Sequence, residues 1–217
     1  LWTVCDSEVL LLNGETGDIE ETIPVNGGGG FSFVYGGAAD ADGNFWGLDT
    51  GSSQLFRVDN VTYQMQTWPL PPSGGYGITV DSVGRPWVCG GGGASRFNVN
   101  NATWDSAGGG QFGIGGCMTD GDQLIWHSNQ GGTLLGFNIE TLNIDEQIQL
   151  PEYVHGVSVD FAGMVWGVSF AGNNAYRADP VTDQVDTYNG LFGAYTYSDM
   201  TGFALSTVGG GNPPPPG

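Results

Sequence analysis

The chain has 217 residues, of which 39% are hydrophobic, and this combination favours one folded domain with a sizeable core over a disordered chain. Its 23 acidic residues face only four basic residues, all arginine, and the formal net charge of −19 disfavours a nucleic acid or an anionic membrane as partner. No stretch approaches the roughly 20 apolar residues of a membrane-spanning helix, so no membrane span is expected.

One short pattern recurs along the chain: an aspartate closes a run of small or apolar residues, and a tryptophan follows six positions later. The aspartates lie 39 to 41 residues apart. The pairs are Asp40 and Trp46, Asp81 and Trp87, Asp120 and Trp126, Asp160 and Trp166, and Asp199 with Leu205. Most units carry a glycine three positions after the aspartate, such as Gly43. Aspartate accepts hydrogen bonds from the backbone two residues on, and glycine adopts positive φ, so the pattern predicts a turn between antiparallel strands.

A second turn is expected downstream of each tryptophan, where a short strand-like run ends in Asp or Asn. These residues are Asp59, Asn98, Asn138 and Asp179, and Asn13 has the same setting near the N-terminus. Two turns per unit, separated by strand-like runs without helical periodicity, give four strands in about 40 residues, which is typical of a β-propeller blade. One tryptophan per unit at the same strand position suits the space between adjacent sheets.

The sequence therefore predicts an all-β propeller of four-stranded antiparallel blades. Whole units are expected at about 35–73, 74–112, 113–153 and 154–193. Residues 1–34 would supply three strands of a fifth blade and residues 194–208 would close it, although residues 202–206 resemble the strand that residues 1–5 already supply, so a segment of a larger ring stays an alternative. Residues 209–217, with four prolines from Pro213 to Pro216, predict an extended linker or tail that joins other domains of the same parent chain.

Three cysteines, Cys5, Cys89 and Cys117, permit at most one intramolecular disulfide, and their spacing does not assign the pairing. Asn60 and Asn101 each begin an Asn-x-Thr acceptor pattern for N-glycosylation. Together with the absence of lysine, the acidity and the proline tail, these features favour an extracellular or cell-surface protein.

The first strand of each propeller blade lines the central channel, so residues at its start face a shared space. Four residues hold this position in successive units: Tyr35, Tyr76, His155 and Tyr195. The strands that carry them consist mainly of small, neutral residues, which favours a packed or water-filled channel without chemistry. In the alternative, functional interpretation, the four side chains meet at one mouth of the channel and form a ligand site. His155 is the member of this set that can act as a general base near neutral pH. Aromatic residues outside the repeat register are further candidates for ligand contact at the surface: Tyr63, Trp68, Trp104 and Tyr188.

Two pairs of aspartates offer clustered oxygen donors of the kind that calcium prefers. They are Asp40 with Asp42 and Asp120 with Asp122. The remaining acidic positions of an EF-hand loop do not follow them, so we interpret these aspartates as turn residues and keep calcium as a secondary hypothesis.

The blade sequence at residues 39–46 (ADADGNFW), followed by residues 55–59 (LFRVD), resembles the blades of the virginiamycin B lyase (streptogramin lyase) propellers, and NHL-type repeats are similar. The resemblance extends to about Val208. It implies a metal-dependent ring-opening elimination in which histidines and glutamates around the channel act with magnesium, and His155 lies at a position of that kind. The chain departs from the pattern because no second channel histidine follows, and the position three after tryptophan, often acidic in the family, is acidic only at Asp49.

The principal hypothesis is a non-enzymatic extracellular propeller without a cofactor, acting as a structural, ligand-binding or adhesion module of a larger surface protein. Its expected partners are other domains of that protein and an extracellular small molecule or glycan. The alternative is a metal-dependent lyase or hydrolase that uses His155 and Asp49 with magnesium or calcium.

Overall fold

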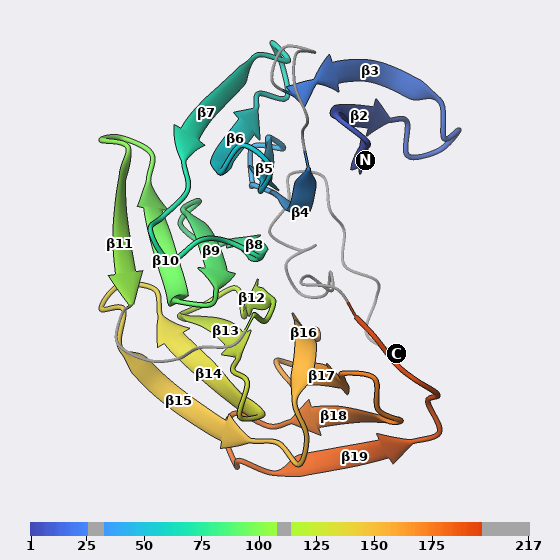
Figure 1. The fold of residues 1–217 in the computed structure, drawn as a ribbon, viewed down its shortest axis with the longest axis vertical. Helices are drawn as coiled ribbons and strands as arrows, with labels where there is room; N and C mark the ends of the chain where they lie inside the picture. The colour runs from blue at the N-terminus through green and yellow to red at the C-terminus, as the bar shows by residue number, and fades with distance from the viewer. Residues whose placement is uncertain (26–32, 108–113, 197–217) are drawn as a thin grey trace.

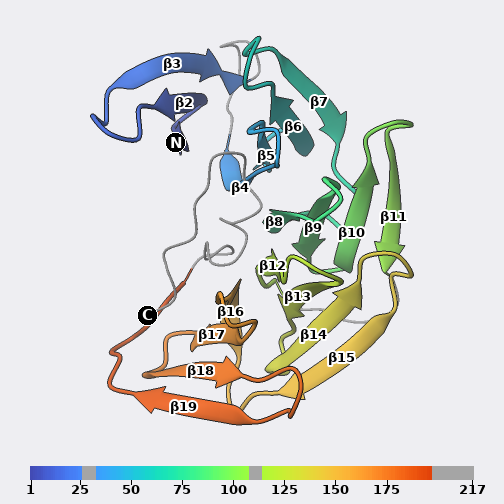
Figure 2. The same ribbon diagram turned by 180° about the vertical axis from the view of Figure 1, so that it is seen from behind.

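The computed structural model describes residues 1–25, 33–107 and 114–196, and within these ranges it contains no α-helix. In these ranges, nineteen strands form five antiparallel sheets, which are arranged as blades around a common axis (Figure 1). The same arrangement is seen from behind in Figure 2. The predicted all-β propeller is thus confirmed, with five blades. No helix in the described part of the chain has the length and apolar character needed to cross a membrane.

The blades follow one another in chain order. Blade 1 contains β1 (Trp2–Cys5), β2 (Glu8–Leu12) and β3 (Ile19–Pro24). Blade 2 contains β4 (Val34–Ala39), β5 (Phe45–Asp49), β6 (Gln54–Val58) and β7 (Met65–Pro69). Blade 3 contains β8 (Gly77–Val80), β9 (Pro86–Gly90), β10 (Gly93–Asn98) and β11 (Thr103–Ala107). Blade 4 contains β12 (Cys117–Thr119), β13 (Leu124–Ser128), β14 (Thr133–Asn138) and β15 (Ile144–Gln149). Blade 5 contains β16 (Val154–Val159), β17 (Val165–Ser169), β18 (Asn174–Ala178) and β19 (Val185–Asn189).

The first strands of blades 2 to 5, β4, β8, β12 and β16, lie nearest the axis in both views (Figures 1 and 2). In blade 1 the described strands correspond to the outer three, because Trp2 pairs with Leu11 on β2 just as Trp46 pairs with Arg57 on β6. The strand expected to complete this blade begins at Ala194, but residues 194–196 form no strand. Its continuation, residues 202–206 and the tail at residues 209–217 all lie outside the described residues.

The hydrophobic core consists of layers between adjacent blades. Trp46, Trp87 and Trp126 are each almost wholly buried in one of these layers, and Trp2 packs at the edge of the layer between blades 1 and 2. In the layer between blades 4 and 5, Trp126 meets Val157 and Tyr176 of the next sheet. Trp166, in the last described blade, is only partly buried and stacks on Tyr188. The tryptophans therefore fill the spaces between sheets, as their spacing predicts.

The aspartate of each repeat organises the turn between the first two strands of its blade. One oxygen of Asp40 accepts bonds from the backbone N–H groups of Asp42 and Asn44, at 3.1 and 2.9 Å. The same pair of bonds recurs at Asp81, Asp120 and Asp160. Gly43 adopts the positive φ that the pattern requires, at 84°. The Asp120 unit has Gln123 at that place and uses the positive φ of Gly121, at 79°, instead.

In three blades, the six-residue spacing between aspartate and tryptophan allows the two side chains to form a hydrogen bond, which the periodicity of the sequence does not reveal. The second carboxylate oxygen of Asp40 accepts a bond from the indole N–H of Trp46 at 2.9 Å. Asp81 binds Trp87 in the same way at 2.9 Å, and Asp160 binds Trp166 at 2.8 Å. One carboxylate thus joins the turn of a blade to the large side chain that packs against the next sheet.

The second turns of the blades also share one backbone conformation. Asp59 accepts bonds from the backbone of Val61 and Thr62, and the residue four positions after it, Tyr63, has a φ of 56°. The equivalent residues share this left-handed conformation: Gly17, Ala102, Leu142 and Asp183. Four of the five turns therefore place a side chain where only glycine is free of strain.

We predict that Asp81→Ala lowers the free energy of unfolding by about 3 to 5 kcal/mol, because it leaves the buried indole N–H of Trp87 and the Arg85 guanidinium without their shared acceptor. Asp120→Ala is the matched control. Asp120 accepts the two turn amides, and burial raises the pKa of its carboxyl, so its loss costs only about 1 kcal/mol. Urea denaturation of the two variants measures the difference, and equal losses would contradict the role given to the indole bond.

A second pair of variants tests strain at the outer turns. Ala102 is exposed and has a φ of 54°, so Ala102→Gly is expected to raise the free energy of unfolding by about 1 kcal/mol. Gly17 holds the equivalent position with a φ of 77° and open space around it, so Gly17→Ala is expected to lower stability by a similar amount. Thermal unfolding of both proteins checks the opposite signs, and a gain from Gly17→Ala would refute the explanation.

Candidate functional site

The structure brings together the four residues that repeat position places at one end of the axis, and we call this end the mouth. The Tyr76 hydroxyl is their common partner. It lies 2.5 Å from the Tyr35 hydroxyl, 3.3 Å from the Tyr195 hydroxyl and 2.6 Å from Nε2 of His155. Their rings are also in contact, with Tyr35 and Tyr76 centroids 4.6 Å apart and His155 and Tyr195 centroids 5.5 Å apart.

These four side chains come from four places in the ring of blades. Tyr35 lies on β4 and His155 on β16, both near the start of the innermost strand of their blade. Tyr76 directly precedes β8, and Tyr195 follows β19. Equivalent positions in successive repeats point at one axis, so residues as distant in sequence as Tyr76 and Tyr195 become neighbours.

Two residues that repeat position does not select complete the surroundings of His155. The Tyr153 hydroxyl lies 2.6 Å from Nδ1 of His155 and donates to the carbonyl oxygen of Ile114 at 2.8 Å. Phe170, which follows β17, packs its ring against those of His155, Tyr153 and Tyr195. An aromatic residue two places before the channel histidine was the available clue to Tyr153, whereas Phe170 belongs to a loop outside the repeat pattern.

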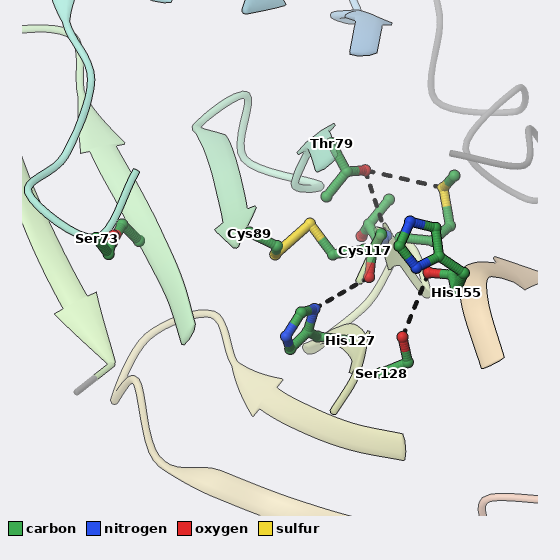
Figure 3. The surroundings of a disulfide bond; sticks show 11 residues. Ser73, Thr79, Cys89, Cys117, His127, Ser128 and His155 are labelled. Carbon is green, nitrogen blue, oxygen red and sulfur yellow. Dashed lines mark hydrogen bonds between the residues drawn. A yellow bond between two sulfur atoms is a disulfide. The ribbon is translucent and has the colours of Figure 1, made fainter. Parts of the chain in front are cut away.

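The backbone of His155 is held by the neighbouring blade. Its carbonyl oxygen accepts a bond from the Gly116 N–H at 2.7 Å and from the Ser128 hydroxyl at 3.3 Å (Figure 3). Gly115 allows this close approach, because a Cβ atom there would collide with the side chain and the carbonyl oxygen of Ser128. His155 is therefore positioned through its main chain as well as through both ring nitrogens.

Burial shifts the pKa values of three titratable groups of this cluster toward the neutral form. Burial lowers the pKa of His155 below its ordinary value, which favours the uncharged imidazole. Burial raises the pKa of Tyr153 to about 12. Burial, followed by the hydrogen bonds from Tyr195 and Tyr35, raises the pKa of Tyr76 still further. The mouth thus holds phenols and a neutral imidazole.

Apolar side chains around this cluster reach solvent. Phe33, which stacks on Tyr35, is 50% exposed, and Phe170 is 48% exposed. Tyr195 is 44% exposed and Ile114 is 50% exposed, whereas His155 is only 8% exposed. The outer layer of the mouth is therefore exposed to solvent, whereas the histidine is buried.

A disulfide joins two blades close to this site. Cys89 on β9 pairs with Cys117 on β12, with Cα atoms 6.0 Å apart (Figure 3). Cys5 is an exposed free cysteine. His127 lies opposite Cys117 on the neighbouring strand β13, fully buried, and its Nδ1 donates to the carbonyl oxygen of Gly116 at 3.1 Å. Burial lowers the pKa of His127 to about 4.

The carboxylate expected to act with His155 in a lyase serves a turn. Asp49 is 1% exposed and accepts bonds from the backbone N–H groups of Phe33, Gly51 and Ser52, and from the Ser52 hydroxyl at 2.6 Å. The four aspartates considered for calcium, Asp40, Asp42, Asp120 and Asp122, lie at the first turns of blades 2 and 4, where Asp40 and Asp120 bind backbone amides. Within the described ranges, no group of three or more His, Cys, Asp and Glu side chains is placed to hold a metal ion.

The two glycosylation motifs have different settings. The side-chain amide of Asn60 donates to the carbonyl oxygen of Asp42, so it is engaged in the fold. Asn101 is exposed, and its side-chain oxygen accepts a bond from the Thr103 hydroxyl at 2.7 Å.

Three of the aromatic residues outside the repeat register pack against repeat residues. Trp68 stacks on Trp46, and Trp104 contacts Phe97 and donates to the carbonyl oxygen of Pro69 at 2.9 Å. Tyr188 covers Trp166, and Tyr63 packs at the edge of the layer between blades 1 and 2. These residues extend the core outward, since outer strands also need apolar cover.

Comparison with known proteins identifies the architecture. No family model and no curated protein matches the sequence. Virginiamycin B lyase from Staphylococcus aureus has a similar structure, with a TM-score of 0.68 and 16% identity over 85% of this chain and 63% of the lyase chain. A streptogramin B lyase gives a TM-score of 0.70 and 20% identity over 85% of this chain and 62% of that chain. A catalytically inactive variant of the S. aureus enzyme, solved with quinupristin, gives 0.67 and 16% over 85% and 63%.

The chain spans a little under two thirds of the length of these lyase structures. At such identities the likeness shows a shared propeller fold, which agrees with the resemblance of the blade sequences.

The buried histidine generates a testable pH dependence. His127 has an ordinary pKa of 6.5 and a folded pKa of about 4, so the unfolded chain binds the extra proton as the pH falls between these values. Stability from this group is complete above pH 6.5 and declines by about 3 kcal/mol toward pH 4. His155 contributes in the same direction, and the raised pKa of Asp120 opposes both.

The variant His127→Gln stays uncharged across this range and isolates the contribution. We expect its unfolding free energy to fall less steeply than that of the parent protein when urea denaturation is measured from pH 7 to pH 4.5. Parallel profiles would show that His127 does not titrate as its burial requires.

Proposed function

We propose that this chain is a non-enzymatic, ligand-binding β-propeller whose site is the mouth formed by Tyr35, Tyr76, His155 and Tyr195. The observation that carries the proposal is the convergence of three phenols and an imidazole, supplied by separate parts of the ring, on the hydroxyl of Tyr76. Exposed rings of Phe33 and Phe170 surround this polar centre. A few polar groups set in an aromatic surface are the usual composition of a small-molecule site.

The positions of the two residues expected to carry lyase chemistry support binding over catalysis. Both nitrogens of His155 are hydrogen-bonded to tyrosine hydroxyls, so a substrate proton would have to displace one of them. Asp49 is buried and occupied by turn amides. General acid–base catalysis needs its groups within reach of the substrate, and these two are directed into the protein.

We also infer that the propeller belongs to an extracellular or cell-surface protein, as a ligand-binding or adhesion module. The disulfide between Cys89 and Cys117 supports this location, because such bonds persist in oxidising compartments. The proline run from Pro213 to Pro216 would connect the propeller to other domains of its parent chain, and the ligand would be an extracellular small molecule or a glycan end.

Ligand binding at the mouth is tested with small aromatic fragments of different charge, observed by saturation-transfer NMR. Phe170→Ala removes an exposed ring of the mouth and is expected to weaken fragment binding on the order of tenfold, the loss of an aromatic contact. Phe161→Ala is the matched control, since Phe161 is 45% exposed and lies beyond the opposite end of β16. Equal fragment binding by both variants would show that the ligand site does not lie at the mouth.

Catalysis is tested in parallel by incubating the protein with cyclic and linear ester peptides in the presence of magnesium. We expect no product. Turnover that disappears in His155→Ala, with the fold intact by circular dichroism, would replace the binding proposal with the lyase alternative.

A further inference from the structure

We infer that the mouth selects a positively charged organic ligand that donates hydrogen bonds, such as an alkylammonium or arylalkylammonium ion, and this inference rests on the proposed binding function. The inference follows from the directions of the hydrogen bonds at the mouth. Each hydroxyl and the neutral imidazole has a single proton to donate, so the direction of the first bond fixes the direction of every later one.

The chain of bonds begins at the carbonyl oxygen of Ile114. A carbonyl oxygen can only accept, so the Tyr153 hydroxyl donates its one proton to that oxygen, at 2.8 Å. The second close contact of the same hydroxyl, 2.6 Å from Nδ1 of His155, must then be a bond that Tyr153 accepts. Nδ1 of His155 therefore carries the ring proton.

A neutral imidazole has one N–H group, so Nε2 of His155 is an acceptor. The Tyr76 hydroxyl, 2.6 Å away, donates its proton to this nitrogen. Having no further proton, the Tyr76 oxygen can only accept from the other two hydroxyls. Tyr35 and Tyr195 are the donors in these bonds, at 2.5 and 3.3 Å.

Both outer hydroxyls thus direct their protons inward, toward Tyr76. Any further partner of Tyr35 or Tyr195, whatever other contacts these residues make, has to be a hydrogen-bond donor. Tyr195 is 44% exposed, and its hydrogen bond to Tyr76 lies in the solvent-exposed part of the cluster. An ammonium group offers several donors and no acceptor, whereas a carboxylate offers none.

Charge points to the same class of ligand. The chain has no lysine, and its formal net charge is −19. The four arginines are engaged with carboxylates of their own sheets or neighbouring turns: Arg57 with Asp59, Arg85 with Asp81 and Glu140, Arg96 with Asp105, and Arg177 with Asp186. An anionic ligand would meet a repulsive field, while a cation is attracted by it and by the faces of the exposed rings.

The experiment is isothermal titration with three ligands of similar size: 2-phenylethylammonium, 2-phenylethanol and 3-phenylpropionate. We expect the ammonium to bind on the order of tenfold more tightly than the alcohol, the increment of one charged hydrogen bond, and the carboxylate to show no saturable binding. Tyr195→Phe keeps the ring and removes the acceptor oxygen, so it is expected to abolish the advantage of the ammonium, while the alcohol, which can donate only one neutral hydrogen bond, loses much less affinity. Tyr188→Phe, a tyrosine on β19 that stacks on Trp166, should change neither affinity.

The outcomes separate this inference from the function on which it rests. Equal binding of ammonium and alcohol, or tighter binding of the carboxylate, would overturn the selection of donors and cations while the binding function stands. An ammonium advantage that survives in Tyr195→Phe would also overturn it, because attraction by the overall charge would then suffice. Absence of binding by all three ligands would count against both proposals.

Discussion

The structure depends on the convergence of five sheets at one axis. The innermost strand β4 continues after Tyr35 with the small residues Gly36, Gly37, Ala38 and Ala39. Residues at equivalent positions of different repeats therefore lie close together at the axis. Tyr35, Tyr76 and His155 form the mouth for that reason.

The repeat aspartate supplies the local order that this convergence needs. One carboxylate binds two turn amides and, in three of the blades, the indole that packs against the adjacent sheet. A buried carboxylate is costly unless its oxygens are satisfied, and the turn amides and the indole provide that satisfaction. In these three blades, secondary structure and inter-blade packing therefore depend on the same side chain, and the six-residue spacing places the indole within reach of its carboxylate.

Periodicity allowed the blades, their turns, the buried tryptophans and the meeting of the four mouth residues to be predicted from sequence. Residues outside the period could not be placed in this way. Tyr153 and Phe170 enter the site from loops, and the pairing of Cys89 with Cys117 depends on which strands face each other across two blades. For Asp49, acidity alone suggested chemistry, whereas the structure shows that it accepts hydrogen bonds from the turn residues Gly51 and Ser52.

The directions of the hydrogen bonds at the mouth depend on which nitrogen of the His155 imidazole carries the proton. If His155 carries its proton on Nδ1, the hydroxyls of Tyr76, Tyr35 and Tyr195 are oriented in sequence and present an acceptor surface to a ligand. Long-range proton–nitrogen NMR of the histidine side chains, with His155→Gln for assignment, determines this tautomer directly at neutral pH. We expect Nδ1 of His155 to be protonated and Nε2 to be bare. A proton on Nε2, or on both nitrogens, would reverse the bonds to Tyr76 and contradict the account.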